Sequence, residues 1–450
     1  MMKLTDKFGN SVSTRSRKAL EFYDEAVTQF LQYRLDPLAT IELALEEDPS
    51  FVMAHCFKAG LLATTTEQGT EATIAAALQA AERNFEHALQ RERMHIAAAH
   101  AWLSRDFAGA VKLYGDIVSE FPRDIFALQV AHLGDFYLGQ SSLLRDRPAQ
   151  VLPAWSEDEP ARGFIHGMYA FGLEECGLYA QAEAEGRRAV EMNPGDAWGA
   201  HAVAHVLEMQ GRTEAGITWL QSTSPGWSHE NAFAYHNWWH LALYHLESEN
   251  HGAALQLYDT RIRPAPSRVA LEMIDASALL WRLRLRSVDV GDRWIELADA
   301  WEAFGEDGYY AFNDVHALMA FLVTGREQQV RKILAGLQRA AAGDGTNAMM
   351  SREIGLPMAR ALCAFEQQDY DVAIDQLLRV RGIAQRFGGS HAQRDLLHLT
   401  LVEAALRAGR LSLARALCAE RLALKPDSGF NKRLLQRVHL QSRQVGSRAA

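Results

Sequence analysis

Apolar residues recur three and four positions apart along most of the chain, and no alternating run is bounded by Asn-Gly or Asp-Gly turns. A period of three to four residues buries one stripe of an α-helix, whereas a half-buried strand needs strict alternation. Alanine, leucine, glutamate and arginine dominate these stretches, and all four favour helices. The pattern therefore predicts an all-α protein.

The predicted helices come in pairs that repeat along the chain. Residues 167–194 show one unit, with a helix, a turn at Gly177, a second helix and a stop at Pro194. Proline ends a helix because it lacks the backbone donor and clashes with the preceding turn. The next two units stop at Pro225 and Pro264. Turns are predicted at Gly139, Gly177, Gly211, Asn250, Gly291, Gly325, Gln368 and Gly409.

These turns are 34 to 43 residues apart, close to the tetratricopeptide period of about 34 residues. We expect a tetratricopeptide-repeat α-solenoid, a right-handed superhelix of antiparallel helix pairs, as one domain over residues 17–437. An N-terminal arm is expected over 1–16 and a flexible C-terminal tail over 438–450. Pro, Gly and Ser content predicts three long loops, of the kind that form lids or binding elements: 141–163, 222–233 and 341–357.

The turns provide a ruler for the first helix of each pair, which lines the concave groove of a tetratricopeptide solenoid. Three positions before consecutive turns stand Glu174, Glu208 and Glu247. Spacings of four and seven residues keep side chains on one stripe of a helix. His201 and His205 therefore share a stripe with Glu208, and we expect this stripe to face the groove.

The helix of the next unit adds polar residues to the same groove. Asn237, His240 and Tyr244 share a stripe with Glu247, and first helices of adjacent repeats pack about 9 Å apart. Trp239 is predicted to pack between repeats, whereas Trp238 is a candidate ligand contact. A cluster of three histidines and up to three carboxylates is therefore expected in the groove.

Three interpretations of this cluster remain open. As a binding module, the groove would hold a small polar molecule or a peptide segment. As an enzyme, it would use His201, His205 and His240 as bases or ligands and Glu208 or Glu247 as the acid–base partner. As a scaffold, it would bind other proteins while the polar cluster satisfies itself. The expected ligand contacts include Glu174, Asn237, Trp238 and Tyr244.

The histidine spacing also suits a metal ion. Two histidines four residues apart on a helix, with a third nearby, are ligands that zinc or another divalent metal accepts. The candidate ligands are His201, His205 and His240, although the HExxH motif is absent. A divalent metal is therefore the one cofactor that the sequence suggests. No Gly-rich phosphate loop or GxSxG elbow is present.

Composition narrows the partners and the compartment. The net charge is −10 and the pI about 5.9, so neither nucleic acid nor an anionic membrane is an expected partner. Lysine is scarce on the groove stripe, which favours a neutral or cationic ligand. Four widely separated cysteines and the lack of an N-terminal apolar run predict a cytoplasmic protein. The oligomeric state is not predicted.

Several blocks of the chain closely resemble the tetratricopeptide repeat protein 38 family. These are HAVAHVLEMQGR, HNWWHLALYHLE, FNDVHALMA at 312–320 and GGSHAQRDLLHLT at 388–400, and the resemblance covers almost the whole chain. It implies an all-helical repeat protein of cytoplasmic character and implies no particular reaction. It also adds candidates that a strongly curved superhelix would bring across the groove: Asn313, His316, His391, Arg394 and Asp395.

Overall fold

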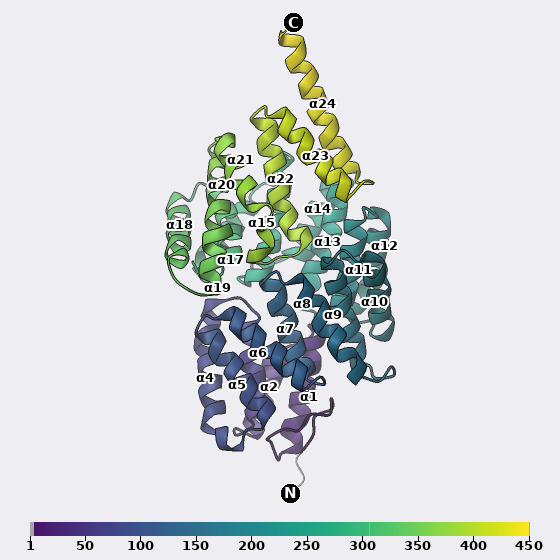
Figure 1. The fold of residues 1–450 in the computed structure, drawn as a ribbon, viewed down its shortest axis with the longest axis vertical. Helices are drawn as coiled ribbons and strands as arrows, with labels where there is room; N and C mark the ends of the chain where they lie inside the picture. The colour runs from purple at the N-terminus through teal and green to yellow at the C-terminus, as the bar shows by residue number, and fades with distance from the viewer. Residues whose placement is uncertain (1–3, 306, 450) are drawn as a thin grey trace. The chain divides into compact units, whose positions relative to one another are not determined.

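A computed structural model describes residues 4–305 and 307–449, and within these ranges every regular element is helical. Two isolated bridges, Thr5–Ser11 and Arg34–Asn231, are the only β pairings of the described residues. Successive helices pack as antiparallel pairs (Figure 1), which confirms the predicted all-α solenoid of helix pairs. None of the described helices combines the length and apolarity needed to cross a membrane.

The chain divides into two compact units, and each is described by itself. The first comprises Met1–Val203, Thr223–Ala234 and Asp344–Asn347. The second comprises Ala204–Ser222, Tyr235–Gly343 and Ala348–Ala450. The predicted single domain over 17–437 stays a prediction.

The first unit contains ten complete helices and three short 3-10 turns among its described residues. They are α1 (Arg17–Gln32), α2 (Pro37–Glu47), α3 (Val52–Ala63), η1 (Gln68–Thr70), α4 (Glu71–Arg83), η2 (Phe85–His87), α5 (Gln90–Leu103), α6 (Phe107–Glu120), α7 (Ile125–Tyr137), α8 (Ser141–Val151), η3 (Leu152–Ala154), α9 (Ala161–Glu175) and α10 (Tyr179–Met192).

Four further helices have residues in both units: α11 (Ala197–Met209), α12 (Thr213–Trp227), α13 (Ala234–Glu247) and α19 (Thr346–Met350). The remaining elements belong to the second unit. They are α14 (His251–Leu257), η4 (Tyr258–Ile262), α15 (Ala270–Leu285), α16 (Arg293–Phe304), α17 (Ala311–Val323), α18 (Glu327–Ala341), η5 (Ser351–Gly355), α20 (Leu356–Glu366), α21 (Tyr370–Val380), η6 (Ala384–Phe387), α22 (His391–Arg407), α23 (Leu411–Leu424) and α24 (Gly429–Ala449).

The predicted turns have the left-handed backbone that a tight link between helices requires. At seven of the eight positions, six glycines and Gln368, φ lies between 56° and 76°. Glycine adopts this region without the Cβ clash that other residues meet. At the eighth turn Glu249 has φ 57°, and Asn250 instead caps α14 by accepting a bond from the Ala253 amide (3.1 Å). The predicted turn positions are confirmed, the eighth to within one residue.

All three predicted loops contain helix. The loop prediction is wrong for 141–163 and 341–357, and it holds for residues 228–233 of the segment 222–233. Residues 141–163 contain α8 and η3, residues 222–233 begin inside α12, and residues 341–357 contain α19, η5 and the start of α20. Burial explains why α8 is a helix, because Leu144 and Val151 lie on the same face of it and both are buried. Packing of an apolar face contributes more to helix stability than local propensity does.

One proline predicted to end a helix lies within its last turn, because α12 passes Pro225 to end at Trp227. Pro148, which is part of the predicted loop 141–163, is internal to α8. Trp227 is fully buried, and burying a tryptophan stabilises this last turn despite the missing proline donor. The stops at Pro194 and Pro264 are confirmed, because α10 ends at Met192 and η4 at Ile262.

The segments outside the predicted domain are also structured. In residues 4–16, Phe8 and Val12 are buried, and Asp6 lies 3.7 Å from Arg91 of α5. The helix α24 contains residues 438–449. The division of the chain into an arm (1–16), a domain (17–437) and a tail (438–450) therefore stays a prediction.

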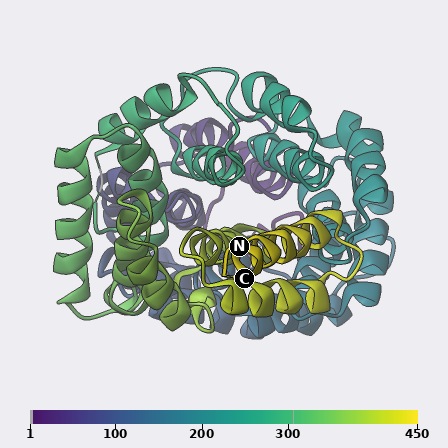
Figure 2. The ribbon, with the colours of Figure 1, turned by 90° about the horizontal axis from the view of Figure 1, so that it is seen from above.

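The two ends of the second unit meet. Its helices lead from teal α13 through green to yellow α22–α24 (Figure 2). Trp281 of α15 donates to the Thr400 hydroxyl of α22 (3.0 Å). Lys425, which follows α23, pairs with Glu208 of α11 at 3.4 Å. The last helices of the unit thus return to its first ones.

Close packing between α12 and α13 gives a first testable prediction. A Cβ on Gly216 would lie 2.1 Å from Tyr244 Cζ, and Tyr244 is 1% exposed with its hydroxyl donating to Ala204 O (2.5 Å). Gly216→Ala is therefore expected to lower the free energy of unfolding by about 1–3 kcal/mol, measured by urea denaturation.

Gly252→Ala is the matched control, because a Cβ on this glycine of α14 meets no atom within 4 Å. In a helix that change leaves stability equal or raises it by up to about 1 kcal/mol. Equal stability of the two variants would contradict the close approach of α12 to Tyr244.

Candidate functional site

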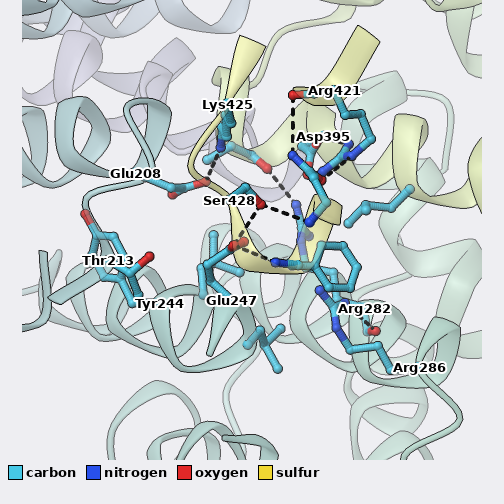
Figure 3. Close-up of a pocket in the computed structure, with 17 residues that line it drawn as sticks. Glu208, Thr213, Tyr244, Glu247, Arg282, Arg286, Asp395, Arg421, Lys425 and Ser428 are labelled. Atoms are coloured by element: carbon cyan, nitrogen blue, oxygen red, sulfur yellow. Dashed lines mark hydrogen bonds and ion pairs between the residues drawn. The ribbon is translucent and has the colours of Figure 1, made fainter. Parts of the chain in front are cut away.

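A pocket of about 50 Å³ lies where the two ends of the second unit meet. A cavity of this volume holds a few water molecules. Its lining comes from α11, α12, α13, α15, α22, α23, the α23–α24 connection and the start of α24, and most of its polar side chains are charged (Figure 3). The polar side chains include Glu208, Tyr244, Glu247, Arg282, Arg286, Asp395, Arg421, Lys425 and Ser428.

Arg421 forms the central ion pair of the pocket. Its guanidinium grips the Asp395 carboxylate with two nitrogens, Nη2 lying 3.0 Å from Oδ2, and its Nε donates to Asn431 Oδ1 (2.8 Å). Burial would raise the pKa of Asp395, but the Arg421 charge holds that pKa well below its usual range. Asp395 is therefore an anion whose charge is already balanced.

Glu208 forms the second pair and uses both oxygens. Oε1 lies 3.4 Å from Lys425 Nζ, and Oε2 accepts from His240 Nδ1 at 3.2 Å. Burial opposes ionisation, yet Lys425 and the hydrogen bond from His240 lower the pKa of Glu208 to about 2. Lys425 is thereby held at the pocket by a charged partner.

Arg282 and Arg286 differ from these pairs because neither guanidinium has a carboxylate at ion-pair distance. The charges of Asp395 and the two pocket glutamates act on them from farther away. The two arginines lie four residues apart on α15, hence on one face. Arg282 Nη2 donates to Ala392 O (2.6 Å), and the Arg286 guanidinium lies 4.0 Å from the Phe430 ring centroid. In the described part of the chain no carboxylate oxygen lies within 4.0 Å of either guanidinium. Burial lowers both pKa values, that of Arg286 to about 10, with Arg282 adding repulsion.

Glu247 serves a structural contact within the pocket. One oxygen accepts from the Ser428 hydroxyl (2.7 Å) and from the Phe430 amide (3.0 Å), which fixes the start of α24. Four cationic side chains thus face three carboxylates across the pocket. The excess positive charge comes from the arginines of α15.

Three histidines lie behind Glu208 in the core of the second unit. His205, His236 and His240 each offer a ring nitrogen, and these nitrogens lie within 4.8 Å of one another. The ring centroids are 4.4 Å apart for His205 and His240 and 4.9 Å apart for His236 and His240. All three side chains are buried, and burial lowers the pKa values of His205 and His240. His236 Nδ1 lies 2.6 Å from Asp275 Oδ2.

The structure brings together only some of the predicted groove residues. Glu208, Tyr244, Glu247 and Asp395 line the pocket, and Asp395 is the one candidate of the 388–400 block that does so. His201 belongs to the first unit, where its buried ring stacks on Phe171 with centroids 5.2 Å apart. The predicted metal set of His201, His205 and His240 is thus shared between two units.

Other candidates on the predicted stripe lie away from the pocket lining. Glu174 is buried in α9 of the first unit, and Asn237 is buried in α13. Trp238 is half-buried with the Arg261 guanidinium 5.2 Å above its ring. Trp239 is fully buried, as predicted, and its ring stacks on His236 at 5.3 Å.

The candidates drawn in by the family resemblance have structural partners. Asn313 and His316 are buried in α17, and His316 Nδ1 lies 2.8 Å from Phe312 O. His391 begins α22, and Arg394 donates to the carbonyl of Gly389. None of these four residues lines the pocket. Ser390 caps α22 by accepting from the Gln393 amide (3.3 Å), as an ordinary helix start requires.

Five important residues escaped the turn ruler, although the sequence carries a signal for them. His236 precedes His240 by four residues, so it lies one helical turn before that histidine on α13. Arg282 with Arg286, and Arg421 with Lys425, show the same spacing of four. The charge of the pocket differs from that of the predicted stripe, because its cations come from later helices. The neutral or cationic ligand that the stripe favours stays a prediction.

Comparison with known proteins adds similarities of low identity. No family model matches the chain. It is similar to Cut9 in the crystal structure of the anaphase-promoting complex hetero-tetramer Cut9–Hcn1, with 13% identity, a TM-score of 0.43, and coverage of 94% of this chain and 68% of that one. The human IFIT1 dimer with PPP-AAAA shows 13% identity, a TM-score of 0.44 and coverage of 98% and 96%. Yeast Tom70 shows 12% identity, a TM-score of 0.34 and coverage of 95% and 96%. Likenesses at this level carry no functional argument, and the resemblance to the tetratricopeptide repeat protein 38 family stays a prediction.

Proposed function

We propose that the protein is a helical-repeat binding module whose second unit holds a small polar molecule by an anionic group, a phosphate or a carboxylate. The observation that carries this proposal is the pair Arg282 and Arg286, which line the pocket without a carboxylate at ion-pair distance among the described residues. Taking an unpaired guanidinium out of water costs free energy, and a bound anion offsets that cost.

The geometry of arginine supports the choice of ligand group. A guanidinium presents planar, paired donors that match the oxygens of a phosphate or a carboxylate. Arg421 and Lys425 stand beside this pair, each held in place by its own carboxylate, Asp395 and Glu208. An anion in the pocket would therefore meet preorganised positive charge rather than recruit it.

The size of the pocket favours one small group. A volume of about 50 Å³ accommodates a phosphate or a carboxylate, whereas an extended peptide segment needs a longer groove. A peptide ligand would enter only by its carboxylate end. The proposal thus narrows the predicted small molecule or peptide segment to a ligand with an exposed anionic terminus.

The test is calorimetric titration with inorganic phosphate and with succinate, at an ionic strength kept constant with chloride. Arg286→Met keeps the apolar packing on Phe430 and removes the charge. A charge-assisted hydrogen bond contributes about 1.5–3 kcal/mol, so affinity is expected to fall roughly 10- to 150-fold. Arg331→Met is the control, since that arginine is 69% exposed and pairs within its own helix.

Two results would overturn the proposal. One is an absence of saturable heat with either anion up to roughly 10 mM. The other is equal affinity of the wild type and Arg286→Met, which would show that the anion binds outside the pocket. Equal affinity of the wild type and Arg331→Met is required for a specific effect.

A further inference from the structure

We infer that His205, His236 and His240 form a binding site for a divalent transition metal, with zinc as the expected occupant. This site lies behind the pocket in the second unit and does not depend on the anion proposed above. Imidazole nitrogen is a ligand that zinc and the neighbouring first-row metals accept readily. The inference replaces His201 by His236, so that all three ligands belong to one unit.

The backbone already places the three rings for this role. His236 and His240 lie one helical turn apart on α13, and His205 approaches from α11, with ring nitrogens within 4.8 Å of one another. Zinc–nitrogen bonds of about 2.0–2.1 Å in a tetrahedral arrangement set ligand nitrogens about 3.3 Å apart. Small changes in the side-chain torsions that move each ring nitrogen by about an ångström bring the nitrogens to the spacing of a tetrahedral site.

Two carboxylates fix which nitrogen of each ring on α13 faces the metal. Asp275 Oδ2 lies 2.6 Å from His236 Nδ1, and Glu208 Oε2 lies 3.2 Å from His240 Nδ1. A metal-ligating histidine typically donates its other ring N–H to a carboxylate, which orients the ring and raises its basicity. These bonds assign Nε2 as the ligand atom of His236 and of His240.

Asp275 is an independent observation that favours a further positive charge nearby, in addition to that of Arg282, which already acts on it. Its side chain is 1% exposed, and its Oδ1 accepts no hydrogen bond in the described part of the chain. A buried carboxylate is costly unless a cation stands near it. A divalent ion on the far side of the His236 ring would supply that charge through the imidazole.

A buried histidine elsewhere in the unit shows what an ordinary structural role looks like. His316 of α17 is also buried, yet its Nδ1 lies 2.8 Å from a backbone carbonyl, that of Phe312, instead of a carboxylate. It belongs to no group of ligand-bearing side chains in the described chain. His316 is therefore the matched control for the three-histidine site.

The experiment measures metal content and affinity on protein purified without a histidine tag. Zn²⁺ is titrated against a chromophoric chelator, and elemental analysis gives the stoichiometry. We expect one Zn²⁺ for each chain, loss of that ion in His205→Ala and His236→Ala, and retention in His316→Ala. Asp275→Asn should weaken Zn²⁺ binding about 10- to 100-fold while keeping the stoichiometry, as expected for a residue that positions a ligand.

A second measurement keeps the inference falsifiable if the alanine variants fail to fold. Co²⁺ added to the wild-type chain should produce the visible absorption of a tetrahedral site, displaced by Zn²⁺. A wild-type chain that takes up no stoichiometric Zn²⁺ and gives no such Co²⁺ spectrum overturns the inference. Retention of the ion in folded His236→Ala overturns it too, because the ion would then lie elsewhere. The phosphate titration is read separately, so failure of one site leaves the other intact.

Discussion

Replacing Arg421 with methionine is expected to lower the free energy of unfolding by about 3–5 kcal/mol. Arg421 is 10% exposed and Asp395 is 28% exposed, so this ion pair is largely withdrawn from water. The guanidinium also donates to Asn431 at the start of α24. Methionine keeps most of the side-chain volume but leaves the Asp395 carboxylate without its cation, and an uncompensated charge accounts for the loss.

Urea unfolding at pH 7 measures this effect, with Arg331→Met as the control. Arg331 and Glu327 form an i,i+4 pair at 69% and 83% exposure, and such surface pairs contribute less than about 0.5 kcal/mol. The double variant Arg421→Met with Asp395→Leu should regain most of the stability, because replacing both partners by apolar groups is often neutral. A loss below about 1 kcal/mol in the single variant would show that water already solvates the pair.

Acidification is expected to destabilise the second unit through Glu208. The pKa of this carboxylate falls from its ordinary 4.5 to about 2 in the folded chain, because Lys425 and His240 outweigh burial. A depressed folded pKa contributes stability that is present above the unfolded pKa and is lost as pH falls towards the folded value. The contribution is about 3 kcal/mol above pH 5 and disappears between about pH 4.5 and pH 2.

Glu208→Gln isolates this contribution, since glutamine keeps an acceptor for His240 but carries no charge. The variant should be about 3 kcal/mol less stable than the wild type at pH 7, and the two should converge as the pH approaches 2. Urea unfolding at a series of pH values gives both curves, and Glu327→Gln, at a fully exposed glutamate, should parallel the wild type. A constant difference between Glu208→Gln and the wild type at every pH would contradict the depressed pKa.

Local sequence signals predict the repeat but not every helix in it. A tight turn after a helix requires a residue with a left-handed backbone, which glycine adopts most readily. This preference is local, so Gly177 and Gly211 identify real turns from the sequence alone. Proline content is a weaker guide. Pro148 lies within α8 because Leu144 and Val151 of that helix are buried, and this burial depends on distant packing.

The candidate site divides in the same way. Glu208, Tyr244 and Glu247 follow from helical spacing, and the structure places them at one pocket. Arg421 and Lys425 reach the same pocket from a distant part of the chain, with Lys425 217 residues from its partner Glu208. Spacing within a helix carries no information on how far the second unit curves before its own ends meet. For that reason, the arginines of the proposed anion site could not be placed from the sequence.

The separation of 217 residues between Glu208 and Lys425 also sets an order of events during synthesis. A ribosome adds about 5–20 residues per second, so Glu208 emerges roughly 10–40 s before its partner exists. During that interval the pocket lacks Arg421 and Lys425, and Glu208 has no lysine partner. Only translation through α23 and the start of α24 completes the pocket. A molecule retained there would therefore report that translation has passed the start of α24.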